Sequence, residues 1–306
     1  MEIAEILTAL FAPIKHYERA GMQAAADNWP EVGPVLIARV TDAAAALRAD
    51  PASSDESMGL IYALTLFGHL RDESAWPAVV ALCTLPAAVA DNELGGLATE
   101  DLGQILYRCS GRNANALTAL YANSAVDQWI RGAALRALHY GVAEGVVARS
   151  TLLDCLIQTL QSPRLPDAED WAVADHARHD FLAMRPFEHA ELARQLAAAE
   201  VIDADDFDED IESLLREDPV AWAELQQSWR DELARYEPQD LHARMAWWAA
   251  FEENRRPPNV GRGPTFDPID AQSSSRGHGF DAAKAAKRKQ KNKMAQKSRK
   301  ANRKKK

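Results

Sequence analysis

Cysteine is scarce in this chain of 306 residues, and its scarcity excludes two classes of protein. The three cysteines, Cys83, Cys109 and Cys155, are an odd number, lie far apart, and each falls within an apolar helical pattern. A disulfide-stapled secreted domain or a zinc module needs closely spaced cysteine pairs, so the sequence predicts reduced, buried thiols. Reduced thiols are typical of the cytoplasm, and we expect a cytoplasmic protein.

Long hydrophobic runs and nucleotide-binding motifs are also missing. No apolar run approaches the ~20 residues that a membrane-spanning helix needs. The first 21 residues carry acids ahead of their apolar stretch, which predicts an amphipathic helix and not a signal peptide. The chain has no GxxxxGK[ST] loop, no GxGxxG after a strand and no GxSxG elbow. We therefore expect no membrane contact, no cofactor and no enzymatic activity.

Strand alternation is almost absent, whereas apolar residues recur with the period of a helix. The clearest stripes are Trp76, Val79, Val80 and Cys83; Leu102, Ile105, Leu106 and Cys109; Leu152, Leu153, Leu156, Ile157 and Leu160; and Trp222, Leu225, Trp229, Leu233 and Tyr236. The segment Met58–Leu70 is apolar nearly all round, which predicts a helix buried between neighbours. The sequence thus indicates an all-α fold.

Helix ends are signalled by cap residues and by short breaks. Thr99, which two acids follow, is a candidate N-cap, and Ser124 with Asp127 resembles a capping box. Asp218 precedes Pro219, which pairs a cap residue with a first-turn proline. Breaks between helices are expected at Asp50-Pro51, Leu85-Pro86, Gly95-Gly96, Ser110-Gly111, Ser162-Pro163 and Arg185-Pro186.

Two segments show a two-helix layout. His69–Pro86 resembles a degenerate HEAT unit, and Ser124–Ser162 has a similar arrangement. Antiparallel helix pairs in series, each too small to bury its own face, predict a HEAT-like α-solenoid or helical-repeat array. Because exact internal repetition is not visible, a non-repeating helical bundle is the alternative.

The order of these segments resembles a bacterial family, the domain-of-unknown-function 1186 family. The resemblance rests on Leu60–Pro86, Leu97–Gly111 and Ala125–Gly145, and it spans roughly Ile3–Leu215. Members of that family are similar to HEAT-type helical repeat proteins and have no established activity, so the resemblance implies a fold and not a mechanism. Some relatives end in a cysteine- and histidine-rich zinc motif. This chain departs from them, because no cysteine follows Cys155.

The charge of the chain is divided between two regions. Residues 255–306 hold 17 of the 35 Lys+Arg and three acids, a net +14, whereas residues 1–254 hold 18 basic and 42 acidic side chains, a net −24. We therefore expect an acidic helical-repeat domain over residues 1–254, followed by a disordered linker and basic tail over residues 255–306.

The end of the tail carries the candidate nucleic-acid-binding residues. They are Lys284, Lys287, Arg288, Lys289, Lys291, Lys293, Lys297, Arg299, Lys300, Arg303, Lys304, Lys305 and Lys306. No aromatic residue follows Phe280 to stack on a base, so contact with RNA or the ribosome would be electrostatic and salt-sensitive. Two alternatives remain: the tail folds back on the acidic domain, or it has no specific partner.

Three functions follow from these patterns. The favoured one is a non-enzymatic scaffold or adaptor, whose helical domain binds an unknown protein and whose tail contacts RNA or the ribosome. The second is a pure protein-interaction module with a folded-back tail. The third is a metal-dependent enzyme using Asp175, His176 and His179, where two histidines at i, i+3 lie beside a carboxylate. We prefer an exposed polar helix face for these three residues, because no third-ligand motif such as HExxH is present.

Two further clusters have structural and functional interpretations. Trp222, Trp229, Trp247 and Trp248 are expected to cap the last helices of the array, and an aromatic binding surface is the alternative. The acidic run 203–212 lacks the sixth-position glycine of a calcium loop. It is expected to form the acidic first turn of a helix that carries Phe207, Ile211, Leu214 and Leu215.

Overall fold

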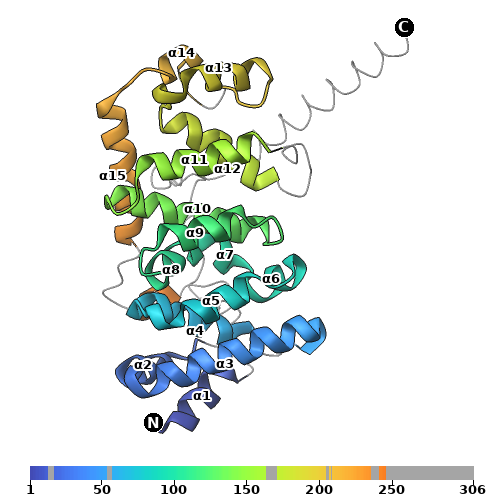
Figure 1. Ribbon diagram of the computed structural model, residues 1–306. Helices are drawn as coiled ribbons and strands as arrows, with labels where there is room; N and C mark the ends of the chain where they lie inside the picture. The colour runs from blue at the N-terminus through green and yellow to red at the C-terminus, as the bar shows by residue number, and fades with distance from the viewer. Residues whose placement is uncertain are drawn as a thin grey trace, which may run out of the picture. The chain divides into compact units, whose positions relative to one another are not determined.

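The computed structural model describes residues 1–12, 17–53, 57–162, 171–204, 207, 209–235 and 241–245. These residues all belong to one compact unit, Met1–Arg255. Their regular structure is helical, with no strand among them, so the predicted all-α fold is confirmed (Figure 1).

The α-helices are α1 (Ile3–Phe11), α2 (Arg19–Asp27), α3 (Trp29–Ala49), α4 (Ser57–Leu70), α5 (Trp76–Cys83), α6 (Ala87–Leu94), α7 (Gly96–Glu100), α8 (Leu102–Cys109), α9 (Ala114–Ala122), α10 (Gln128–Ala143), α11 (Arg149–Leu160), α12 (Trp171–Ala183), α13 (Ala190–Ala198), α14 (Ile211–Leu214), α15 (Pro219–Arg235) and α16 (Leu241–Met245). The 3-10 turns are η1 (Pro51–Ser53), η2 (Glu73–Ala75) and η3 (Phe187–His189).

The helices pack in series along the chain. Helix α3 packs on α5, α4 on α8, α8 and α9 on α10, and α11 on α12. Figure 1 shows the helices from α1 to α14 following one another along the array. Helix α15 departs from that order, because it runs back beside the earlier helices and packs on α10 (Figure 1). The domain is therefore a helical-repeat array with a returning C-terminal segment.

The core lies along a row of inner helices formed by α4, α8 and α10. All residues from Leu60 to Phe67 of α4 are buried, as are all eight residues of α8 and twelve of the sixteen residues of α10. The prediction that Met58–Leu70 forms a helix buried between neighbours is confirmed. Burial on every side explains why α4 is apolar nearly all round and does not show a single stripe.

Glycines allow the inner helices to approach closely. A Cβ atom on Gly68 of α4 would lie 3.2 Å from the Cα atom of Ile105 on α8. A Cβ atom on Gly103 of α8 would lie 3.2 Å from the carbonyl oxygen of Ala133 on α10. Both distances involve main-chain atoms, which side-chain rotation cannot move. The spacing of the row therefore depends on the absence of side chains at these two positions.

Two of the three predicted helix starts are wrong. Thr99 lies inside α7, where its hydroxyl donates to the carbonyl oxygen of Gly96 at 3.1 Å. Ser124 does not begin α10, because Asp127 is the N-cap and its carboxylate accepts from the backbone N–H of Trp129 at 2.8 Å. The acid that was expected at the third helical position thus caps the helix itself, a role in which aspartate is strongly favoured.

The three cysteines are free and buried, as the sequence predicts. Burial raises the pKa of the Cys83 thiol to about 12 and also raises the pKa values of Cys109 and Cys155. We expect the native protein to show almost no thiol reactivity toward a disulfide reagent at pH 8, and three reactive thiols after unfolding in guanidinium chloride. Rapid labelling of one thiol in the native protein would contradict this expectation.

The C-terminal region lies outside the described residues. Three predictions concern that region: the domain boundary at 254/255, the disorder of the tail and the role of its thirteen basic residues. They stay predictions. Among the described helices, none combines the length and the apolar composition that crossing a membrane requires.

Candidate functional site under α15

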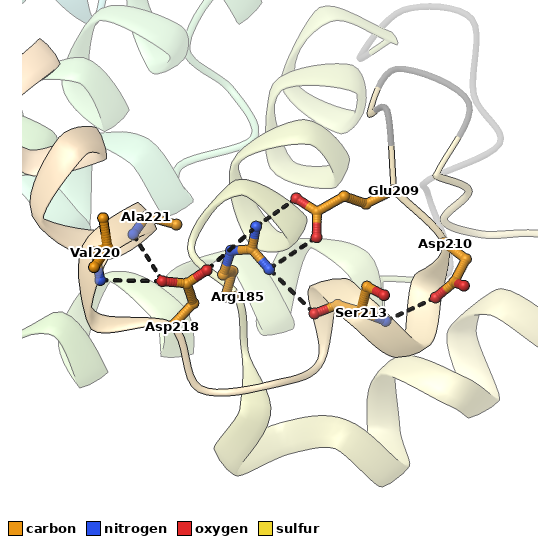
Figure 2. Close-up of polar contacts among 7 residues, drawn as sticks. All are labelled: Arg185, Glu209, Asp210, Ser213, Asp218, Val220 and Ala221. Atoms are coloured by element: carbon orange, nitrogen blue, oxygen red, sulfur yellow. Dashed lines mark hydrogen bonds and ion pairs between the residues drawn. The ribbon is translucent and has the colours of Figure 1, made fainter.

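Helix α15 starts at a capped and proline-fixed position (Figure 2). The carboxylate of Asp218 accepts hydrogen bonds from the backbone N–H groups of Val220 and Ala221, each at 3.0 Å. Pro219 occupies the first helical position, where its missing N–H leaves no donor unsatisfied. The predicted start of this helix is confirmed.

The loop before α15 is tied to the end of α12 by Arg185. This residue has a left-handed backbone conformation, with φ at 49°. Its Nη1 atom donates to Oε2 of Glu209 and to the carbonyl oxygen of Ser213, both at 3.1 Å, and its guanidinium lies 3.9 Å from the carboxylate of Asp218 (Figure 2). A planar guanidinium can bridge three acceptors in this way, whereas a lysine cannot. The start of α15 is therefore fixed in position.

A second arginine holds the start of α15 from the side of α11. Arg149 lies over the ring of Phe187 at 5.3 Å and over the ring of Trp222 at 5.0 Å. Its guanidinium donates to the carbonyl oxygen of Met184 at 2.6 Å and pairs with the carboxylate of Glu188. Burial lowers the pKa of this guanidinium, but arginine stays charged at neutral pH.

The apolar contact between α15 and α10 is a stacked pair of rings. Trp229 is 7% exposed, and its indole lies parallel to the imidazole of His139 with centroids 4.5 Å apart and an interplanar angle of 2°. Leu233, one turn later, is also 7% exposed. Trp222 and Leu225 are only partly buried. The predicted apolar stripe of α15 is therefore confirmed from Trp222 to Leu233, and Trp229 and Leu233 are its buried members. Its last member, Tyr236, lies outside the described residues.

Polar side chains of α15 complete the C-terminal end of α10. The amide nitrogen of Gln226 donates to the carbonyl oxygen of Val142 at 3.3 Å, and Nε of Arg230 donates to the carbonyl oxygen of Ala143 at 2.9 Å. The last carbonyl groups of a helix lack partners within that helix. The carbonyl oxygen of Val142 also accepts from the backbone N–H of Gly145 at 3.1 Å, so Gln226 adds a second bond there, whereas, among the described residues, Arg230 supplies the partner that the carbonyl oxygen of Ala143 otherwise lacks.

An acid on α15 meets a basic and a phenolic group on α10. The hydroxyl of Tyr140 donates to Oε1 of Glu232 at 3.0 Å, and Nε of Arg136 lies 3.5 Å from the same oxygen. Tyr140 is fully buried, whereas Arg136 and Glu232 remain about one third exposed. The contact fixes the register of α15 on α10 more than it adds stability, since exposed ion pairs contribute little.

Helix α16 reaches the first helices of the array. His242 is 4% exposed; its Nδ1 lies 2.6 Å from the hydroxyl of Tyr17 and its Nε2 lies 2.8 Å from Oε1 of Gln23. Met245 is fully buried, with its sulfur 3.6 Å from the hydroxyl of Thr65 on α4. The C-terminal helices thus connect α10 to α2 and α4.

A charged cluster lies beneath the stacked rings. Nε2 of His139 lies 3.1 Å from Oδ2 of Asp180 on α12, and Nδ1 of His179 lies 3.4 Å from Oδ1 of the same carboxylate. Burial alone would raise the pKa of Asp180, but the charge of His139 and hydrogen bonds from both histidines hold it well below its usual value. The ring of His179 also stacks on Phe207 at 5.3 Å. A charged carboxylate therefore orients the platform on which Trp229 lies.

The structure does not bring the three predicted metal-ligating residues together. His176 is exposed, with its ring beside Gly132, whereas Nδ1 of His179 lies 3.4 Å from the carboxylate of Asp180. Across the described part of the chain, no group of three or more His, Cys, Asp or Glu side chains is placed to hold a metal ion. Sequence reasoning missed His139, because its partner Asp180 is 41 positions away on another helix and no motif connects them.

The predicted tryptophan cap is wrong in its position. Trp229 is buried, as a cap requires, but it stacks on His139 near the C-terminal end of α10 and not on the last helices of the array. Trp222 contacts the edge of Trp229, with ring centroids 5.9 Å apart. Trp247 and Trp248 lie outside the described residues.

The acidic run begins a helix as expected, but that helix is shorter than predicted: α14 spans Ile211–Leu214, so Phe207 precedes it and Leu215 is its C-cap. Asp210 is the N-cap of α14, and its carboxylate accepts from the backbone N–H of Ser213 at 2.8 Å (Figure 2). Leu214 of that helix is buried. Glu209 of the same run has a further role that the sequence did not indicate, because it holds Arg185 (Figure 2).

These features define an all-α helical-repeat domain whose last two helices return along its inner row. The chain belongs to the family described as "Protein of unknown function (DUF1186)", whose family model matches residues 1–252. The match extends past the Leu215 limit of the predicted resemblance and includes α15 and α16. No curated protein and no solved structure matches this chain.

Proposed function

We propose that the protein is a non-enzymatic adaptor, whose helical domain binds a protein partner and whose basic tail contacts RNA or the ribosomal surface. The observation that carries the first half is the docking of α15 on α10, where the array holds an amphipathic helix by one stacked aromatic ring and several polar contacts. Helix-in-groove binding is a recurring mode of peptide recognition. The array therefore has the type of surface that this function needs.

The repeat class and the location are part of the same proposal. We interpret the array as built of HEAT-like helix pairs, because tight turns join successive helices: between α4 and α5, Arg71 is left-handed at φ 55°, and the N–H of Asp72 donates to the carbonyl oxygen of Phe67 at 3.0 Å. Such pairs build extended binding surfaces when they stack. The three buried free thiols favour a reducing, cytoplasmic location.

The tail half of the proposal rests on charge. Thirteen lysine and arginine residues lie between Lys284 and Lys306, and one acid, Asp281, precedes them closely. Each phosphate that such a segment neutralises releases condensed counterions, so binding to a single strand falls with salt at a log–log slope of about −0.7 per phosphate. If about ten of these residues contact phosphates, a fourfold rise in salt lowers the affinity roughly 10⁴-fold.

The test uses the full chain and a full-length variant with the thirteen tail lysines and arginines replaced by glutamine. We expect the natural chain to bind labelled single-stranded RNA and ribosomes with a slope of about −7, and the glutamine variant to lose binding. A second variant, with residues 284–306 in scrambled order, is the matched control. It should bind like the natural chain, because an electrostatic contact does not read sequence.

The same variants distinguish the folded-back alternative. A tail held on the acidic domain is released as salt screens the attraction, so the radius of gyration of the free natural chain would rise with salt. The glutamine variant would show no such rise. Equal RNA binding by the natural chain and the glutamine variant would overturn the tail half of the proposal.

A further inference from the structure

Helix α15 is bound to the array by a narrow face. Of its seventeen residues, only Trp229 and Leu233 are buried. By contrast, α10, the helix on which α15 packs, buries twelve of its sixteen residues. A helix that packs by two buried side chains and a few hydrogen bonds belongs to the low-stability end of a fold, from which mobile binding elements are drawn.

The surface beneath α15 presents groups that can bind any suitable helix. It offers a flat imidazole, His139, held in place by Asp180. It offers the hydroxyl donor of Tyr140 beside that platform. It also offers the carbonyl oxygen of Ala143, at the C-terminal end of α10, and that of Val142, which accepts from the backbone N–H of Gly145 at 3.1 Å and has a second lone pair for another donor. Water can satisfy these polar groups when α15 leaves, so exposure of the surface is not prohibitive.

The bound helix shows which partner the surface fits. Relative to Trp229, α15 places a hydrogen-bond donor three residues earlier, Gln226, and another one residue later, Arg230. It places an acid three residues later, Glu232, and an aliphatic side chain four residues later, Leu233. These positions lie on one side of a helix.

We propose that this face of α10 is the docking surface for an amphipathic helix of a partner protein, and that α15 occupies it in the free protein as an intramolecular ligand. The partner helix carries an aromatic residue that stacks on His139, an acid that meets Tyr140 and Arg136, and donors for the end of α10. This inference rests on the proposed adaptor function and names the partner class. The clamp at Arg185 and Asp218 holds the start of α15, and the buried side chains of His242 and Met245 on α16 hold the chain after it, so that α15 is displaced between two attached ends.

The covalent tether sets how strong a competitor must be. A segment attached by a short connection competes at an effective concentration of about 1 mM. A free peptide at about 0.1 mM with the same affinity therefore loses to α15 by roughly tenfold. Replacing Trp229 by alanine removes the stacked ring and is expected to weaken docking in the chain about a hundredfold or more. The same peptide then occupies the α10 surface roughly ten times as often as the weakened α15 does.

The experiment measures binding of a labelled synthetic peptide, residues 219–235, by fluorescence anisotropy. We expect the Trp229→Ala full chain to bind the peptide and the natural chain to bind it at least tenfold more weakly. A peptide that itself carries Trp229→Ala is the matched control and should not bind. Adding Tyr140→Phe to the Trp229→Ala chain should weaken peptide binding two- to tenfold, which locates the peptide on α10. Equal peptide binding by the natural and Trp229→Ala chains, or none by either, would overturn the proposal.

A second measurement covers the case in which Trp229→Ala disturbs the fold. Hydrogen exchange on the natural chain should show the amides of α15 opening at least a hundredfold more often than those of α10. Exchange of both helices at the same rate, through global unfolding, would show that α15 is a permanent part of the core. The RNA experiment depends on the tail alone, so failure here would leave the tail half of the adaptor proposal standing.

Discussion

Replacing Asp180 by asparagine is expected to lower the free energy of unfolding by about 3 kcal/mol at pH 7. The carboxylate pairs with His139 at 3.1 Å and also contacts His179, and the side chains of the His139–Asp180 pair are only 10% and 18% exposed. Removing the carboxylate leaves a buried imidazole, His139, without the acceptor that orients it, which costs more than the loss of an exposed pair. Urea denaturation of the natural and variant chains measures the difference.

The loss should depend on pH in a definite direction. The folded protein holds the pKa of Asp180 below its unfolded value, so its contribution is present above about pH 4 and is lost as the pH falls further. The natural and Asp180→Asn chains should therefore differ by the full amount at pH 7, and the difference should begin to shrink as the pH falls below about 4. Asp154→Asn, at an exposed position on α11, is the control and should change stability by less than about 0.5 kcal/mol. An equal effect of both substitutions would mean that the pairing with His139 is unimportant.

The helices of this protein were predictable because their signals are local. The stripe Leu102, Ile105, Leu106 and Cys109 lies within eight residues, and all four are buried in α8. Asp218 before Pro219 likewise needed only two adjacent residues to mark a helix start. The failures at Thr99 and Ser124 have the same local origin, since several cap-forming residues stand near each start and the sequence does not rank them.

The contacts under α15 were not predictable, because they join distant parts of the chain. His139 and Asp180 come from different helices, and the Gln23 contact of His242 spans 219 positions. The pattern of Trp222, Trp229 and Leu233 revealed an apolar face but not what would cover it. An end cap was the simplest guess for aromatic residues at the end of an array. Only the folded chain shows that the face lies on α10, and this location turns a stability feature into a candidate binding surface.

Replacing Gly68 by alanine is expected to lower the free energy of unfolding by about 2 kcal/mol. The new Cβ would lie 3.2 Å from the Cα atom of Ile105 and 2.8 Å from its Cγ1 atom, so α4 and α8 would have to move apart. In an exposed helix the same substitution stabilises, because alanine forms helices better than glycine by up to about 1 kcal/mol. The sign of the effect therefore tests whether the inner helices pack as closely as the structure shows.

Gly96→Ala is the matched control for this substitution. Gly96 begins α7, and a Cβ atom added there would meet nothing within 4 Å. We expect it to stabilise the protein by about 0.5 kcal/mol, because alanine restricts the unfolded chain without creating a clash. Thermal and urea denaturation should thus move the two variants in opposite directions. If both variants gain stability, the added Cβ at position 68 does not clash with Ile105. Helices α4 and α8 would then lie farther apart than the 3.2 Å distance indicates.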